Sequence, residues 1–197
     1  INFELSRKTF SRIKKPIQKL TNEIYDLEPN SQNKKNILLL NFDPLQYEEL
    51  LMEFKKENIN FLLLNLRKPA ITNKKSLDII KNSKSKIVDL NKFSKFVKSD
   101  IFYAQKNLQN IIEKIFNDDS SFEKLFSVHK FSFWSSIKDQ FRDICTSRFQ
   151  ESTERLFLFK KLFSTFDIDT IFVWVEVGQE EKECILMGKF FSIRSVM

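Results

Sequence analysis

The chain has 197 residues, of which 42% are hydrophobic, so it can bury the core of a globular domain and is not of the disordered class. Its formal charge is +7, but 33 basic residues are nearly matched by 26 acidic ones, and no zinc-ligand spacing or RNA-binding aromatic motif is present. We therefore predict no nucleic-acid partner. The two cysteines, Cys145 and Cys184, lie too far apart to indicate a metal site or a disulfide framework, and a reducing cytoplasm is the simplest setting.

Residues 1–33 are predicted to form an amphipathic helical segment, because apolar residues recur at two heptad positions with lysines and arginines between them. The apolar residues are Phe3, Phe10, Ile17 and Ile24 at one position and Ile13, Leu20 and Leu27 at the other. Pro16 is expected to kink this helix or to begin a second one. The segment either packs on its own domain, or docks on an anionic membrane surface or another helix.

From residue 36 onward, apolar runs alternate with helical patterns. Continuous apolar runs predict strands that are buried on both faces, as in a parallel sheet. The predicted elements are strand 36–42, helix 43–58, strand 59–70, helix 73–84 and strand 86–90. Asp43 has the position of an N-cap for the first of these helices. This βαβαβ order predicts a doubly wound parallel sheet.

A long helical insertion is predicted at about 91–166, with Ser152 as the N-cap of its last helix. Strand 170–177, a helix from 179 and a strand near the end of the chain then complete the sheet. The predicted fold class is therefore α/β, a Rossmann-like doubly wound parallel sheet of about five strands. Residues 34–197 are predicted to form this domain, including the insertion.

Only two glycines are present, Gly178 and Gly188, which excludes a dinucleotide-binding fingerprint and a P-loop. No G-x-S-x-G motif is present either, so an esterase-type serine nucleophile is excluded. His129 is the only histidine, and its aromatic surroundings favour a structural role over a catalytic one.

Ligands of open parallel sheets bind at the carboxyl ends of the strands, where the winding direction reverses. With a strand order 3-2-1-4-5, Asn41 and Asp43 would lie in one crevice with Glu176, which ends the fourth strand. Asn65 and Arg67 would lie one strand further out. Partial burial would raise the pKa of Glu176 and make it a general base, whereas the alternative is that it only ends a strand.

Three glutamates, Glu180, Glu181 and Glu183, lie at the start of the helix that follows this strand. They complement the positive end of the helix dipole and would repel a phosphate at the same place. This edge of the sheet is therefore predicted to bind a neutral hydroxylated ligand.

The stretch "IDTIFVWVEVGQEEKECILMGKFFSIRSVM" resembles a segment of surface-polysaccharide glycosyltransferases of the GT-B fold, where a strand ends in an acidic residue that a glycine and a further glutamate follow. The resemblance assigns importance to Glu176, Gly178 and Glu181. Ser192 and Arg194 stand where the family has a small residue and a proline. The family's Gln-His-Gly motif would follow where this chain stops.

The resemblance implies the acceptor-side, N-terminal half of a two-domain enzyme, with Glu176 as catalytic base or acceptor anchor and a donor-binding domain beyond this chain. No bound cofactor or metal is expected, a nucleotide sugar would be the co-substrate, and a glycan or lipid-linked molecule the acceptor. The expected location is cytoplasmic and peripheral to the membrane, and the piece alone should be inactive. A nucleotide-sugar epimerase of the same architecture and a noncatalytic helical interaction module remain alternative functions. Assembly into a homo-oligomer also remains open.

Overall fold

The computed structural model describes residues 35–53, 59–175 and 178–197. They form two units, which we describe separately. The sheet unit holds the described residues up to Lys92 together with Leu162–Met197, and the helical unit is Phe93–Lys161. The predicted amphipathic segment at 1–33 and the predicted base Glu176 lie outside the described residues.

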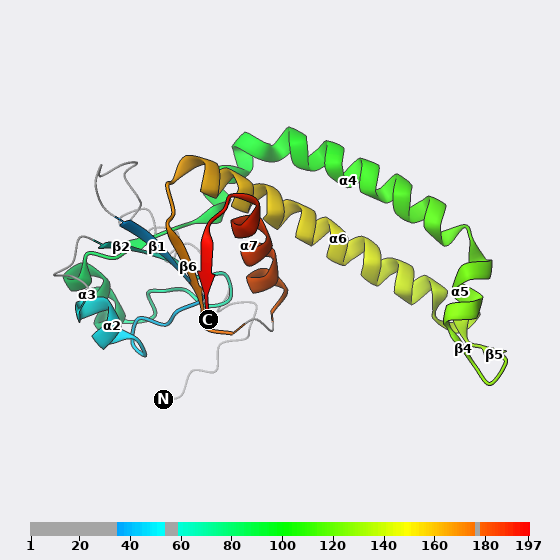
Figure 1. Cartoon of the computed structure of the whole chain (residues 1–197), viewed down its shortest axis with the longest axis horizontal. Coiled ribbons are helices and arrows are strands. Elements are labelled where there is room, and N and C mark those ends of the chain that lie inside the picture. Colours follow the sequence, from blue (N-terminus) through cyan, green and yellow to red (C-terminus); the bar gives the residue numbers. More distant parts are fainter. Residues whose placement is uncertain (1–34, 54–58, 176–177) are drawn as a thin grey trace, which may run out of the picture. The chain divides into compact units, whose positions relative to one another are not determined.

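The sheet unit is built on five parallel strands in the order β3-β2-β1-β6-β7 (Figure 1). The strands are β1 (Lys35–Leu40), β2 (Ile59–Leu64), β3 (Lys86–Ile87), β6 (Thr170–Val173) and β7 (Arg194–Val196). The helices that join them include α2 (Glu48–Glu53), α3 (Lys74–Ser83) and α7 (Gln179–Phe190). The prediction of an α/β chain with a five-stranded parallel sheet is confirmed. The strands also follow the predicted order, with the first strand paired with both the second and the fourth.

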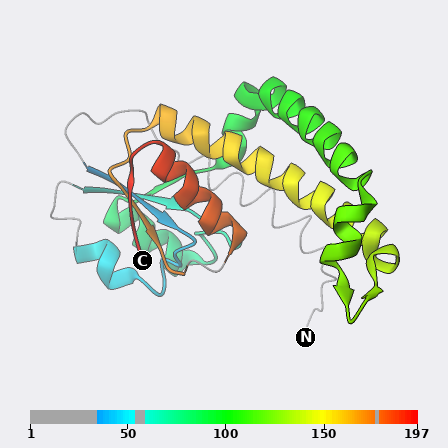
Figure 2. The same cartoon turned by 45° about the vertical axis from the view of Figure 1, so that its right-hand side comes forward.

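The sheet is buried on both faces because its central strands are apolar at successive positions. Leu38 to Leu40 and Leu62 to Leu64 are all buried, and alternation along each strand directs neighbouring side chains to opposite faces. Leu39 and Leu63 belong to a cluster that also contains Leu51 of α2 and Ile79 and Ile80 of α3. Helices α2 and α3 lie on one face and α7 on the other (Figures 1 and 2). Helix α7 packs closely on β6 at Gly188, where a Cβ would lie 2.5 Å from Ile171 Cδ1 and would displace that side chain.

Several predicted boundaries in the sheet unit were wrong. Strands β2 and β6 end at Leu64 and Val173, so residues 65–70 and 174–175 lie outside the sheet. Helix α2 begins at Glu48 rather than after Asp43. The carbonyl of Asp43 accepts hydrogen bonds from the N–H groups of Gln46 and Tyr47, so Asp43 begins a turn that precedes the helix.

The 3-10 turn η2 (Leu90–Phe93) leads into the helical unit. This unit contains the helices α4 (Ser94–Phe116) and α5 (Asp119–Leu125), the short strands β4 (Ser127–Val128) and β5 (Phe131–Ser132), and most of helix α6 (Trp134–Thr165). The predicted N-cap at Ser152 was wrong, because α6 is continuous through that position. No proline or glycine interrupts it, and the Thr153 hydroxyl donates to the carbonyl of Phe149 within the helix. Among the described helices, none is both long and apolar enough to cross a bilayer.

Candidate functional site

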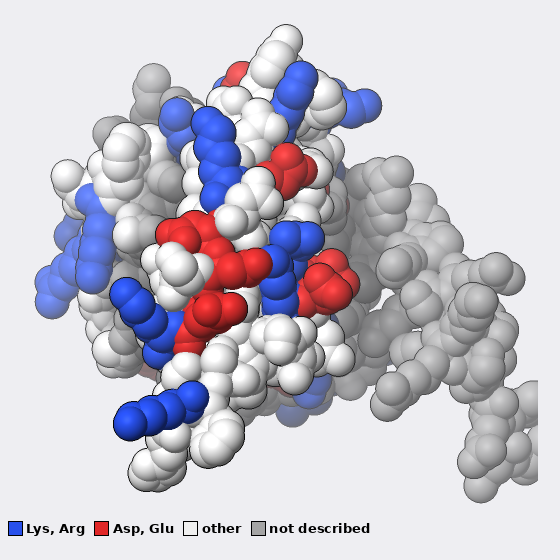
Figure 3. All heavy atoms as spheres, turned by 90° about the vertical axis from the view of Figure 1, so that its right-hand side faces the viewer, with Lys and Arg blue, Asp and Glu red and all other residues white. Residues whose placement is uncertain are grey.

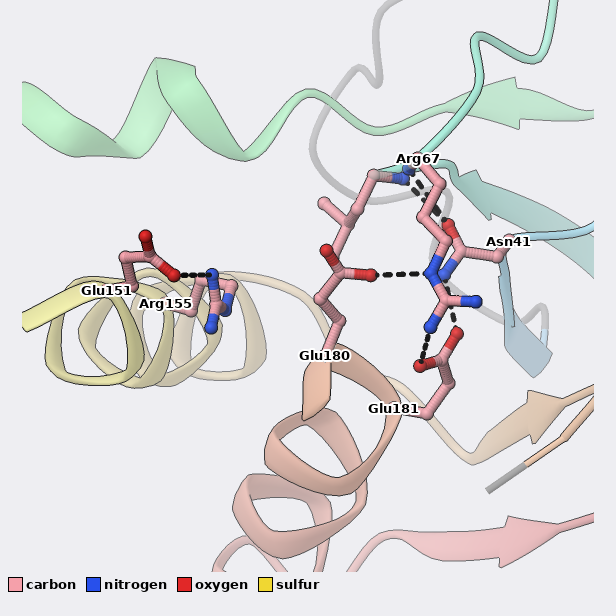
Figure 4. A network of polar contacts seen from close by, with 7 residues as sticks. Asn41, Arg67, Glu151, Arg155, Glu180 and Glu181 are labelled. Atoms are coloured by element: carbon pink, nitrogen blue, oxygen red, sulfur yellow. Dashed lines mark hydrogen bonds and ion pairs between the residues drawn. The ribbon is translucent and has the colours of Figure 1, made fainter. Parts of the chain in front are cut away.

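A polar network lies at the carboxyl ends of the central strands (Figure 4). Asn41 directly follows β1, Arg67 follows β2, and Glu180 and Glu181 are in the first turn of α7, which follows β6. Because β1 pairs with both β2 and β6, these three connections meet at one edge of the sheet. Four predicted site residues, Asn41, Arg67, Gly178 and Glu181, are therefore brought together.

Arg67 contacts two carboxylates of this network, those of Glu180 and Glu181. Its Nε donates to Glu180 Oε2 at 2.9 Å, and its Nη2 donates to Glu181 Oε2 at 2.5 Å. The side chain of Arg67 is 47% exposed, whereas that of Glu181 is only 2% exposed. The hydrogen bond with Glu180 raises the pKa of Arg67 against the opposing effect of burial, and the charges of Glu181 and Glu180 raise it further. Arg67 is therefore a fixed cation at this edge.

Asn41 holds the second oxygen of Glu181 and the backbone that carries Arg67. Its Nδ2 donates to Glu181 Oε1 at 2.8 Å, while its Oδ1 accepts from the N–H groups of Leu66 at 2.9 Å and Arg67 at 3.4 Å. The backbone of Asn41 has a φ of 61°, a left-handed conformation that asparagine tolerates better than most residues. One asparagine side chain thus couples the ends of β1 and β2 to the start of α7.

Gly178 precedes α7 and leaves room for the ion pair. A Cβ at this position would overlap both Arg67 Nη2 and Glu181 Oε2. Its φ of −80° is open to any residue, so glycine matters here through its close approach to these two side chains, which a Cβ would displace, rather than through backbone conformation. The glycine predicted from the resemblance therefore has a physical role in this structure.

Arg67, Glu180 and Glu181 together carry one positive and two negative formal charges, and they differ in their access to a ligand. Both oxygens of the buried Glu181 are hydrogen-bonded, so its carboxylate positions Arg67 and Asn41. Arg67 and Glu180 retain exposed surface and can donate to and accept from an added hydroxyl. The net negative charge disfavours a phosphate here and favours a neutral polyhydroxylated ligand.

Two other predicted residues have local partners. Asp43 is exposed, and its Oδ1 accepts from the Leu45 N–H at 3.0 Å, as expected for a turn. Asn65 donates through Nδ2 to the carbonyl of Phe42 at 2.8 Å, while its Oδ1 is buried without a hydrogen-bond partner among the described residues. Neither contacts the described part of the network through its side chain, so both support the surrounding loops.

Aromatic residues at the same edge were not predicted as site residues. Tyr47 lies between Phe42 and Trp174, with ring centroids 4.7 Å and 5.4 Å away, and burial raises the pKa of Tyr47. Trp174 is 64% exposed although it directly follows β6. The alternation of that strand buries Ile171 and Val173, and the same alternation could have identified Trp174 as outward-facing.

Cys184 lies on α7, three residues beyond Glu181, and is fully buried. Burial raises the pKa of its thiol, and the charge of Glu181 adds to this effect, so the thiol stays protonated and unreactive. Within the described ranges, no group of three or more histidines, cysteines or carboxylates is arranged to hold a metal ion.

Comparisons of the chain with protein-family models, with curated proteins and with solved structures gave no match. The functional conclusion therefore depends on the residues at the carboxyl edge of the sheet and on the chemistry that they support.

Proposed function

We propose that the sheet unit is the Rossmann-like, acceptor-side domain of a GT-B glycosyltransferase. In this proposal the enzyme transfers a sugar from a nucleotide-sugar donor to a glycan or lipid-linked acceptor in surface-polysaccharide assembly. The observation that carries the proposal is the joint presence of the half-exposed Arg67 and the partly exposed Glu180 with the exposed Trp174 at the carboxyl edge of the sheet.

These residue types match the surface of a sugar ring. Its hydroxyls both donate and accept hydrogen bonds, so they can bind a guanidinium and a carboxylate that are held side by side. Its C–H faces are apolar and can lie against an exposed aromatic ring such as that of Trp174. The position also agrees with the rule that open parallel sheets bind ligands beyond the carboxyl ends of their strands.

The proposal assigns different roles to the residues of the network. Arg67 and Glu180 bind acceptor hydroxyls, and Asn41 and Glu181 position Arg67. Glu176 is proposed as the base that removes the proton from the attacking hydroxyl, or as an anchor for that hydroxyl. The nucleotide part of the donor would bind to the other domain of the enzyme, without a bound metal or cofactor on this one.

A noncatalytic interaction module is the second candidate, and the helical unit favours it. Eleven of the seventeen large hydrophobic residues that are exposed in the described chain belong to this unit, which is the shorter of the two. In that case the network would serve only to stabilise the sheet unit, and the exposed apolar residues would carry the biological role.

The test uses the natural protein, with whatever sequence flanks these residues in its gene, and a panel of nucleotide sugars with glycan acceptors. We expect turnover in the wild type and a loss of roughly 100-fold or more in a Glu176→Gln variant, the usual scale for removing a general base. Glu49→Gln on the exposed face of α2 is the matched control and should retain wild-type turnover. Turnover that survives Glu176→Gln would remove its catalytic role, and no turnover with any donor would favour the interaction module.

A further inference from the structure

The β4–β5 hairpin forms an unusual tip of the helical unit. Ser127 pairs with Ser132 and Val128 with Phe131, so the turn consists of His129 and Lys130 alone. Both have positive φ angles, 49° and 71°. Two-residue hairpin turns with two positive φ angles favour asparagine and glycine, and neither residue is present here. The chain thus maintains a strained turn, and such strain often accompanies a functional position.

The hairpin is anchored by a buried aromatic cluster beneath it. The Trp134 ring stacks on Phe122 and Phe126, with centroids 4.4 Å and 5.3 Å away, and its Nε1 donates to Asp119 Oδ1 at 2.7 Å. Lys138 forms an ion pair with the same carboxylate at 2.6 Å. These contacts fix the base of the tip, so its outer side chains are free to serve another role.

The outer side chains of the tip are large, apolar and exposed. Leu125 is 72% exposed and Phe131 is 81% exposed, and Val128 and Phe133 are exposed as well. All four lie within a stretch of nine residues, at the end of α5, in the hairpin and directly after it. A patch of this kind on a soluble surface marks a site for a membrane or another macromolecule.

The charge of the same stretch distinguishes between these partners. Residues 124–133 contain two lysines, Lys124 and Lys130, and no carboxylate, whereas Lys138 is already paired with Asp119. In the view of Figure 3, the lower part of the described surface is mostly uncharged, basic side chains project beside it, and acidic side chains gather above it. Apolar tips beside lysines complement a surface of anionic headgroups.

We propose that this tip, formed by Leu125, Val128, Phe131 and Phe133 with Lys124 and Lys130, inserts into the interface of an anionic lipid bilayer. The apolar side chains would enter the boundary between headgroups and acyl chains, while the lysines would extend to lipid phosphates. A two-residue turn offers far less area than the roughly 800 Å² per partner of a standard protein interface. Insertion into lipid needs no such area, because lipid surrounds the inserted side chains. The inference does not depend on the glycosyltransferase proposal.

The test measures co-sedimentation of the whole chain with vesicles of phosphatidylcholine that contain 30% phosphatidylglycerol or none. A double variant, Leu125→Gln with Phe131→Gln, should bind anionic vesicles at least roughly tenfold more weakly than the wild type, because it removes two inserted apolar groups. The matched control, Phe102→Gln with Ile144→Gln, changes an aromatic and an aliphatic residue that are similarly exposed on α4 and α6 and should bind as the wild type does.

A third variant separates the tip from the basic segment at the start of the chain. Replacing Lys14, Lys15 and Lys19 by glutamine should leave tip-dependent binding in place, so that the tip substitutions still weaken it further. A Phe131→Trp variant retains an apolar ring and should bind vesicles, with its added fluorescence quenched by brominated acyl chains. Melting curves confirm that each variant is folded.

Three results would overturn the proposal. The first is the absence of vesicle binding by the wild type, and the second is equal binding by the tip and control variants. The third is a loss of self-association in sedimentation velocity, without a change in vesicle binding, when the tip is substituted. That last result would instead assign the tip to contact with a second copy of the chain.

Discussion

The two units of this chain bury their apolar residues in different ways. The sheet unit places leucines and isoleucines on both faces of a parallel sheet and covers them with helices. The helical unit has an aromatic cluster around Trp134 and leaves many large side chains along α4 and α6 exposed. The sheet unit is therefore specified by its own core, whereas the helical unit leaves apolar surface that a partner could cover.

The ion-paired carboxylates of the two units also differ in burial. Glu181 in the sheet unit is almost completely buried and is held by Arg67 and Asn41. Asp119 in the helical unit is held by Lys138 and Trp134, but its side chain is half exposed. Removing a hydrogen-bond partner of Glu181 should therefore lower the free energy of unfolding more than removing a partner of Asp119, because water cannot replace the lost partner of a buried carboxylate.

The largest expected effect is on the aromatic cluster. Trp134→Ala should destabilise the helical unit by roughly 3–5 kcal/mol, because it removes a fully buried ring that contacts several others. Hydrogen exchange should show faster opening of the amides near the cluster on α4 and α6, with β1 and β2 amides unchanged. Ile144→Ala, at an exposed position of α6, is the control. Faster exchange throughout β1 and β2 would show that the two units unfold together.

Arg67→Ala should have the next largest effect, lowering the free energy of unfolding of the sheet unit by roughly 1–3 kcal/mol. The substitution leaves the buried Glu181 with Asn41 as its remaining hydrogen-bond donor in the network. Urea denaturation gives the free energy, and alkylation of the buried Cys184 reports local opening near Glu181. Lys75→Ala, which removes an exposed ion pair with Glu48, should change stability by less than roughly 1 kcal/mol. Equal losses of unfolding free energy in Arg67→Ala and Lys75→Ala would contradict the claim that the buried ion pair contributes more than the exposed one.

Acidification should affect the helical unit through Asp119. Its hydrogen bond with Lys138, together with that from Trp134, holds the pKa of Asp119 below its usual value. A depressed carboxyl pKa stabilises the folded state above the unfolded pKa, and this stability is lost as the pH falls through the folded pKa. The difference in melting temperature between the wild type and Asp119→Asn should therefore be largest near neutral pH and disappear in strong acid. If the difference in melting temperature did not change with pH, the stabilisation would come from packing rather than from the charge of Asp119.

The smallest expected effect is at the strained hairpin turn. Replacing His129 and Lys130 by Asn-Gly should stabilise the helical unit by roughly 1 kcal/mol, because these residues adopt positive φ angles more readily. Thermal denaturation measures the change. A decrease in stability would show that the side chains of the turn make favourable contacts in the folded chain.

Much of the sheet could be predicted because its signals are local. The continuous apolar runs identify β1 and β2, and Asn73 begins α3 with the capping box that its sequence favours. The β4–β5 hairpin was missed because its strands have two residues each and carry no periodic pattern. The length of α6 was underestimated because serine and threonine near its middle suggested a cap.

For the candidate site, only the consequences of the strand order could be predicted. The expected strand order brings Asn41 near the start of α7, whereas Arg67 was expected one strand further out. Its side chain nevertheless reaches Glu180 and Glu181. The pairing of Arg67 with Glu180 and Glu181 joins residues that are 113 and 114 positions apart, and no sequence spacing encodes it. It depends on side-chain geometry and on the space that Gly178 leaves open.

The most direct test of the proposed acceptor site is nuclear magnetic resonance of the whole chain titrated with neutral sugars and, separately, with uridine diphosphate. We predict that sugars shift the amides at 41–42, 65–67 and 178–181 at millimolar concentration, and that uridine diphosphate does not. Glu180→Gln and Trp174→Ala should each weaken these shifts, whereas Glu49→Gln should not. Shifts at this edge with uridine diphosphate alone, or none with any sugar, would contradict the assignment of the carboxyl edge to a sugar acceptor.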